Sequence, residues 1–100
     1  MIVIAGEIEI DAAQRDAAVA AAIQMMEATR REAGCISYTF SADLVEPGRF
    51  RIFEEWESPE ALQSHFATPH MAAFQKAVAS LGVRRMAIQR YEVSSVGPLR

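Results

Sequence analysis

Hydrophobic and polar positions alternate along four segments of the chain, and this period of two is typical of β-strands. In the first segment, from Ile2 to Ile10, the isoleucines share one parity while Glu7 and Glu9 share the other. The same alternation returns in three later segments, which are 35–42, 49–57 and 83–93. The sequence therefore predicts four strands, with a turn at Pro47–Gly48 joining the second strand to the third.

An alanine-rich segment over residues 11–33 has the period of an amphipathic helix. Asp11 and Gln14 resemble a capping box at its start, and Gly34 is placed to end it in a left-handed conformation. The apolar positions expected on one helical face are Val19, Ala22, Ile23 and Met26. This segment predicts the longest helix of the chain.

Two shorter helices are indicated by hydroxyl residues that precede prolines, at Ser58–Pro59 and Thr68–Pro69. The second is expected to run to about Leu81 and to end before Gly82. The element order is therefore β-α-β-β-α-β, which predicts a single α+β domain over residues 1–100. Its expected fold is ferredoxin-like, with a four-stranded antiparallel sheet covered by helices on one face.

The sheet face without helices is predicted to be partly apolar, which is unusual for a face open to water. The residues expected there are Val3, Ala5, Phe53, Val83, Ala87 and Val93. Because symmetric homodimers are the commonest oligomers, a second copy of the chain is the simplest cover for this face. The pattern therefore predicts a homodimer.

Composition narrows the functional classes. The chain has 100 residues, 51% of them hydrophobic, a net charge of -3 and a pI of about 5.3, so no cationic surface is expected to bind nucleic acid. Phe53 shares its expected face with Glu55 and Glu57, which also disfavours stacking on RNA bases. With one cysteine, no basic leader and no long apolar run, we expect a cytoplasmic protein that has no membrane partner.

No cofactor or metal site is predicted from the sequence. The five glycines form neither a phosphate-binding loop nor a dinucleotide fingerprint. His65 and His70 are five residues apart, so on one helix they would point in different directions, and Pro69 would interrupt such a helix.

The stretch from residue 54 to residue 71 contains a more specific sequence motif. Glu54, Trp56, Ser58, Leu62 and His65 form the pattern E-x-W-x-S-x-x-x-L-x-x-H, and Thr-Pro-His-Met follows at residues 68–71. Together with the segment 32–38, E-A-G-C-I-S-Y, this pattern resembles the antibiotic biosynthesis monooxygenase family, particularly its bacterial quinol monooxygenase-like members. The matching segments run from residue 32 to about residue 78.

The resemblance implies a dimeric α+β barrel with a cavity between sheet and helices in each subunit. It also implies oxygenation of a small electron-rich aromatic, a quinol or polyphenol, by molecular oxygen without metal, flavin or haem. The haem-degrading branch of the family is disfavoured, because Glu7 stands near its first-strand Asn and the last helix has no histidine beyond His70. Two alternatives remain open, an isomerase of a small carbonyl compound or phosphorylated signalling sugar, and a binding domain without turnover.

Oxygenation of this kind needs a base near a ring hydroxyl and an apolar pocket for the ring. Glu54 is the first candidate base, because it shares a strand face with Ile52 and Trp56, where burial would raise its pKa. His65 is the second candidate and His70 the third. The expected aromatic walls are Trp56, Tyr38, Phe40 and Phe66.

Each of these residues also has a structural interpretation. Glu54 could pair with an arginine such as Arg90 across the sheet, and His65 could bond a loop carbonyl. The aromatic residues could simply build the core of a small domain.

Overall fold

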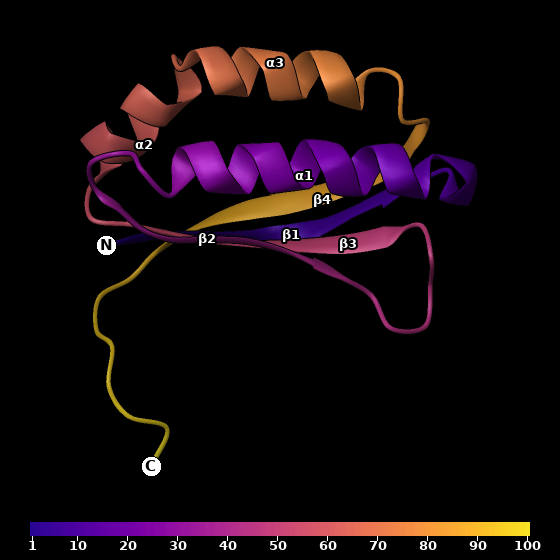
Figure 1. Cartoon of the computed structure of the whole chain (residues 1–100). Coiled ribbons are helices and arrows are strands. Elements are labelled where there is room, and N and C mark those ends of the chain that lie inside the picture. The colour runs from indigo at the N-terminus through magenta and orange to yellow at the C-terminus, as the bar shows by residue number, and fades with distance from the viewer.

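The computed structural model describes residues 1–100 as an antiparallel sheet of four strands with helices on one face (Figure 1). The strand order is β2-β3-β1-β4, so the two central strands, β3 and β1, are not consecutive in the chain. The elements are β1 (Ile2–Ile10), a short 3-10 helix η1 (Ala12–Gln14), α1 (Arg15–Thr29), β2 (Cys35–Ala42), β3 (Arg49–Trp56), α2 (Pro59–Phe66), α3 (Pro69–Val78) and β4 (Val83–Glu92). The predicted α+β ferredoxin-like fold is confirmed.

Strand register determines which side chains enter the interior. Trp56 pairs with Ile2, and Glu54 pairs with Ile4. Paired residues of neighbouring strands project from the same face of a sheet. The apolar row of β1 therefore brings the even-numbered positions of β3 under the helices, and Glu54 enters the interior with them.

The close approach of β4 to β1 depends on Gly6, at the centre of the sheet. A Cβ added at this position would overlap the backbone of Ala87 and Ile88 in β4. Any larger residue at Gly6 would force these strands apart, and with them the cavity wall that β4 provides.

The helix over the alanine-rich segment differs from the prediction in its end and in its buried face. It ends at Thr29, and a turn separates it from Gly34, whose φ of 83° is left-handed as expected. Ile23, predicted to be buried, is 49% exposed, and the buried positions are Ala18, Met25 and Thr29. Because the alanines of this helix lie on several of its faces, the apolar pattern did not define a single buried face.

Strand β2 also departs from simple alternation. A register shift between Cys35 and Ser37 inserts an extra residue against β3. As a result Cys35 packs against the core, while Ile36 is half exposed. Tyr38 and Phe40 lie beyond the irregularity and face the helices as predicted.

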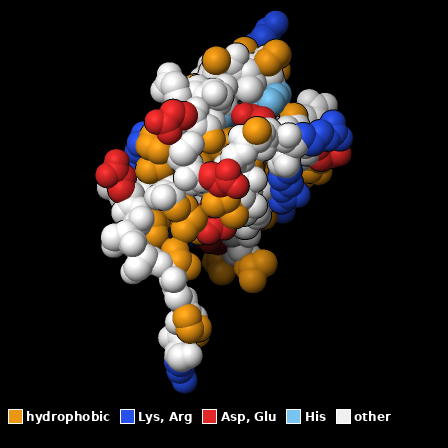
Figure 2. Space-filling view, turned by 90° about the vertical axis from the view of Figure 1, so that its left-hand side faces the viewer, with side chains coloured by type: hydrophobic (Ala, Val, Ile, Leu, Met, Phe, Trp, Pro, Cys, Tyr) orange, Lys and Arg blue, Asp and Glu red, His pale blue; other side chains and the backbone are white.

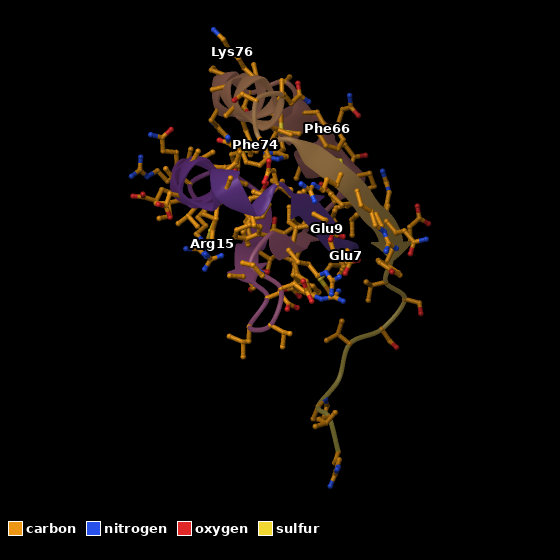
Figure 3. The ribbon with its side chains drawn as sticks, turned by 90° about the vertical axis from the view of Figure 1, so that its right-hand side faces the viewer. Glu7, Glu9, Arg15, Phe66, Phe74 and Lys76 are labelled. Atoms are coloured by element: carbon orange, nitrogen blue, oxygen red, sulfur yellow. The ribbon has the colours of Figure 1, made fainter.

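The predicted caps of the two later helices are confirmed. The Ser58 hydroxyl accepts a hydrogen bond from the Ala61 N–H at 3.2 Å, and the Thr68 hydroxyl accepts one from the Met71 N–H at 3.2 Å. The chain therefore begins a new helix at Pro69, in a new direction. In the resulting α3, Lys76 points away from the sheet (Figure 3).

The interior contains two hydrophobic clusters. The Trp56 cluster consists of Ile2, Met25, Tyr38, Ile52, Trp56 and Leu62. The Phe50 cluster consists of Ile8, Ile10, Ala18, Phe50 and Leu81. Helices α1 and α3 run over both clusters (Figure 1). None of the helices is long and apolar enough to cross a membrane.

The other face of the sheet carries no helix. Phe53 and Tyr91 are about half exposed there, and Glu7 lies between Arg51 at 3.4 Å and Arg85 at 3.5 Å. Residues 94–100 leave the body as an extended tail in which Val96 and Leu99 are exposed (Figure 1 and Figure 2).

Candidate active site

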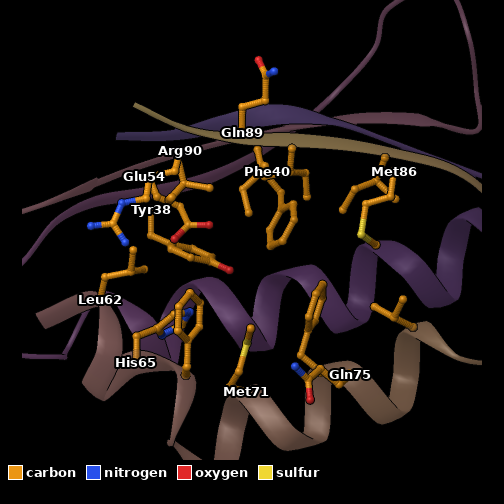
Figure 4. A pocket seen from close by; sticks show the side chains of 17 residues that line it. Tyr38, Phe40, Glu54, Leu62, His65, Met71, Gln75, Met86, Gln89 and Arg90 are labelled. Carbon is orange, nitrogen blue, oxygen red and sulfur yellow. The ribbon is translucent and has the colours of Figure 1, made fainter. Parts of the chain in front are cut away.

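A cavity of about 490 Å³ lies between the sheet and helices α2 and α3 (Figure 4). Twelve of the 17 residues that line it are hydrophobic. The aliphatic and aromatic walls include Ile4, Ile52, Ile88, Leu62, Met71 and Phe74. The volume and the apolar lining are those of a small-molecule site. Gln89 also borders the cavity, but its side chain points away across the sheet (Figure 4).

Glu54 is the carboxylate of this cavity. It is only 6% exposed, and its Oε1 accepts a hydrogen bond from the Trp56 indole N–H at 2.8 Å. Burial raises the pKa of Glu54 to about 7; the indole hydrogen bond opposes the rise, and the nearby charge of Glu32 adds to it. Glu54 can therefore accept or return a proton near neutral pH.

Trp56 does not line the cavity, and the expectation that it would is wrong. Its side chain is fully buried behind the wall, where its ring centroid lies 4.8 Å from that of His65. The indole therefore supports Glu54 and His65 from behind. A tryptophan buried with its N–H bonded in this way is a rigid scaffold for both groups.

The other aromatic residues predicted for the site, Tyr38, Phe40 and Phe66, all border the cavity. Tyr38 and Phe40 meet edge to face at 5.6 Å, and Phe40 continues to Phe74 at 5.4 Å. Burial raises the pKa of the Tyr38 hydroxyl above its usual range, so this group stays protonated. No protein group bonds to the hydroxyl, which leaves it free to donate to a ligand (Figure 4).

His65 lines the cavity and is almost completely buried, with 1% of the residue exposed. Its Nδ1 lies 2.7 Å from Glu32 Oε2, so the expected bond to a loop carbonyl is not formed. His70 does not reach the cavity. Its Nε2 lies 2.7 Å from the same Glu32 oxygen.

His65 and His70 are close together in the structure, contrary to the expectation from their spacing on one helix. Helix α2 ends at Phe66 and α3 begins at Pro69, so the two histidines belong to different helices and converge. One ligand atom from each of Glu32, His65 and His70 lies within 4.8 Å of the others, so these residues could hold a metal ion. In the structure the same atoms are already joined by the two short hydrogen bonds.

Sequence reasoning did not assign a role to Glu32 or to Met71. The only signal for Glu32 was its position in the segment 32–38, and its separation of 33 positions from His65 matches no local period. The sequence suggested Arg90 as an ion-pair partner for Glu54, but that ion pair is not formed. Arg90 instead lies 3.8 Å from Glu92 and is the only lysine or arginine at the cavity.

Comparison with known proteins agrees with this architecture. The family model described as antibiotic biosynthesis monooxygenase matches residues 1–77. An uncharacterized protein of Synechocystis sp. is 33% identical over 98% of this chain and 67% of its own length. A solved structure from Deinococcus radiodurans, whose name places it among the antibiotic biosynthesis monooxygenases, is 29% identical with a TM-score of 0.91 and covers 100% of this chain and 99% of its own. A Bacteroides thetaiotaomicron structure described as a possible oxidoreductase is 25% identical with a TM-score of 0.84, covering 92% of this chain and 96% of its own. The chain therefore belongs to the antibiotic biosynthesis monooxygenase family.

Proposed function

We propose that this protein is a monooxygenase that hydroxylates a quinol or a related polyphenol with molecular oxygen inside the cavity. Family membership and the similar structures support a general monooxygenase-type function. The proposed substrate class is supported by the position of Glu54: it is a buried carboxylate with a pKa of about 7, in an apolar cavity with aromatic walls.

The proposed reaction balances without an external reductant. Ground-state oxygen reacts slowly with closed-shell molecules, but a deprotonated quinol is electron-rich enough to transfer electrons to it. The quinol loses the hydrogens of both hydroxyl groups and gains one oxygen atom on a ring carbon, while the second oxygen atom leaves as water. The substrate thus supplies all the electrons that reduce oxygen, and the protein supplies binding, a base and hydrogen-bond donors.

Glu54 takes the first proton in this scheme. Its raised pKa lies close to neutral pH, where the carboxylate is more basic than an ordinary one and about half of the molecules hold it ionised, ready to accept a phenolic proton. His65 borders the same cavity and is the second proton acceptor. The protonated Tyr38 hydroxyl donates a hydrogen bond to the oxyanion that develops, and Phe40 and Phe74 hold the ring.

The same cavity fits a phosphorylated sugar less well. A phosphate group is bound by several backbone N–H groups or by clustered cationic side chains. Here the lining is mostly hydrophobic, and its only lysine or arginine is Arg90. The lining therefore favours an aromatic ligand over a phosphorylated one.

We also propose that the helix-free face of the sheet is covered by a second copy of the chain. The exposed rings of Phe53 and Tyr91 support this partner, since an uncovered aromatic patch on a sheet is costly in water. Sedimentation at micromolar concentration is expected to give a dimer, and Phe53→Lys is expected to give a monomer. A wild-type monomer would contradict this part of the proposal.

Oxygen consumption with 1,4-naphthoquinol tests the function. The rate above buffer and above heat-denatured protein is the enzymatic rate, because quinols also oxidise in air. The monomethyl and dimethyl ethers of the same quinol are matched controls, since they keep the ring but remove one or both ionisable hydroxyls. We expect turnover of the quinol and none of the dimethyl ether. A rate equal to background across a panel of quinols would instead favour a binding domain or an isomerase.

A further inference from the structure

Three side chains from separate parts of the chain meet behind the cavity wall formed by His65. Glu32 follows α1, His65 lies in α2 and His70 lies in α3. Glu32 Oε2 is 2.7 Å from His65 Nδ1 and 2.7 Å from His70 Nε2. One carboxylate oxygen therefore joins two imidazoles, and this contact links the turn after α1 to both short helices.

The chemistry of the contacts fixes where the protons lie. An ionised carboxylate only accepts hydrogen bonds, so each imidazole must donate an N–H to Glu32. In neutral His65 the proton is then on Nδ1, and Nε2 carries a free lone pair. Nε2 has no protein partner, and it is not among the fully enclosed polar atoms that lack one. Because His65 borders the cavity and Glu32 occupies its Nδ1, Nε2 is the ring nitrogen that remains for a ligand in the cavity.

We infer that Glu32 and His70 are positioning residues: Glu32 holds His65 in the tautomer that presents Nε2 to the cavity, and His70 holds the Glu32 carboxylate in place. The inference rests on the proposed function for the task of His65, which is to accept a proton from the second quinol hydroxyl. Glu54 serves the first hydroxyl. Both acceptors are supported by Trp56, whose indole bonds Glu54 at 2.8 Å and whose ring lies against His65.

The exposure of the three groups explains why two positioning residues are needed. The side chain of His65 is 2% exposed, that of Glu32 14% and that of His70 25%. Glu32 is thus close enough to the surface to rotate toward water if only one imidazole held it. His70 is the most exposed of the three groups, as expected for a group that closes this small network from outside.

Nitrogen-15 NMR of histidine-labelled protein without substrate tests the tautomer directly, at a pH where the histidines are neutral. We expect the His65 proton on Nδ1 in wild type. In Glu32→Gln and Glu32→Leu we expect a mixture, or the Nε2–H form that free imidazole side chains favour in water. Glu27→Gln removes an exposed carboxylate of α1 and is expected to leave the His65 spectrum unchanged. A wild-type His65 proton on Nε2 would overturn the inference.

Kinetics separate positioning from a purely structural role. Glu32 does not line the cavity, so Glu32→Gln is expected to lower kcat about tenfold to a thousandfold while KM changes by less than about twofold. His70→Ala is expected to act in the same direction with a smaller effect. Variants that lose only thermal stability, and keep the wild-type kcat and His65 tautomer, would contradict the inference.

The two proposals can fail separately. If wild type oxidises no quinol but His65 carries its proton on Nδ1 only while Glu32 is present, the proposed function fails and the positioning role stands. If wild type is active and the tautomer is insensitive to Glu32, the positioning role is wrong. Activity that requires added Fe²⁺ or Zn²⁺ and disappears in His70→Ala would make the three residues a metal centre, and that result would also overturn the inference.

Discussion

The Trp56 cluster and the Phe50 cluster both lie under helices α1 and α3 and share strands β1 and β3, yet they differ in polarity and in free space. The Phe50 end has only a small void of about 30 Å³, and all nine residues around it are hydrophobic. The Trp56 cluster contributes Tyr38, Ile52 and Leu62 to the 490 Å³ cavity, whereas the Phe50 cluster contributes only Ile8. The Trp56 end also encloses two ionisable groups, Glu54 and His65. One end is therefore packed for stability, while the other contains polar groups that packing alone does not require.

The difference is informative because burying an ionisable group is costly unless it is paired. Glu54 has one hydrogen bond, from Trp56, and its pKa is raised rather than lowered. No basic side chain neutralises it. A buried carboxylate held in this state beside an open cavity is typical of a functional site.

The largest expected effect is on activity at the Trp56 end. Glu54→Gln keeps the size of the side chain and an acceptor for the Trp56 N–H, but removes the base. We expect kcat for quinol oxidation to fall about 10²- to 10⁴-fold, the span typical of a lost general base. Glu55→Gln is the matched control, since Glu55 is the next residue of β3 and bonds Ser37 on the opposite face of the sheet. Equal rates for wild type and Glu54→Gln would remove Glu54 from the mechanism.

At the other end, the expected effect is on stability. Phe50→Ala removes a large ring from the Phe50 cluster and leaves a cavity, so the free energy of unfolding is expected to drop by about 3–5 kcal/mol. Denaturant unfolding measures the drop. The kcat of the remaining folded protein should stay near the wild-type value. A large loss of kcat in the folded fraction would show that the two ends are not independent.

A smaller effect is expected in the pH dependence of stability. The pKa of Glu54 is 4.5 in an unfolded chain and about 7 in the folded protein, so the unfolded state ionises first as pH rises. Stability is therefore lost between pH 4.5 and 7, by up to about 3 kcal/mol, and the loss is complete above pH 7. Glu54→Gln lacks this loss, so its stability relative to wild type should increase from pH 5 to pH 8. A constant difference between the two proteins would contradict the raised pKa.

Features of the Trp56 end that depend on local sequence pattern were predictable from the sequence. Alternation in β3 placed Glu54 on the face of Ile52 and Trp56, and the raised pKa follows from that face. The hydroxyl caps at Ser58 and Thr68 correctly located the starts of α2 and α3.

Features that depend on tertiary packing were not predictable in the same way. Glu32 meets two histidines only because α1, α2 and α3 are packed together, and no local period relates residues so far apart in the chain. Trp56 was expected at the cavity surface, but its size and its hydrogen bond to Glu54 favour a position behind it. The bulge that exposes Ile36 likewise depends on the pairing of β2 with β3 rather than on the sequence of β2.

Turnover of naphthoquinol under ¹⁸O₂, followed by mass spectrometry of the promptly extracted product, tests the central claim most directly. We expect a hydroxyquinone with one ¹⁸O atom in the new hydroxyl group and the other ¹⁸O atom in water. This product should be lost in Glu54→Gln but not in Glu55→Gln. Unlabelled quinone formed together with hydrogen peroxide, at the rate seen in buffer, would show that the protein does not transfer oxygen to the ring and would contradict the account.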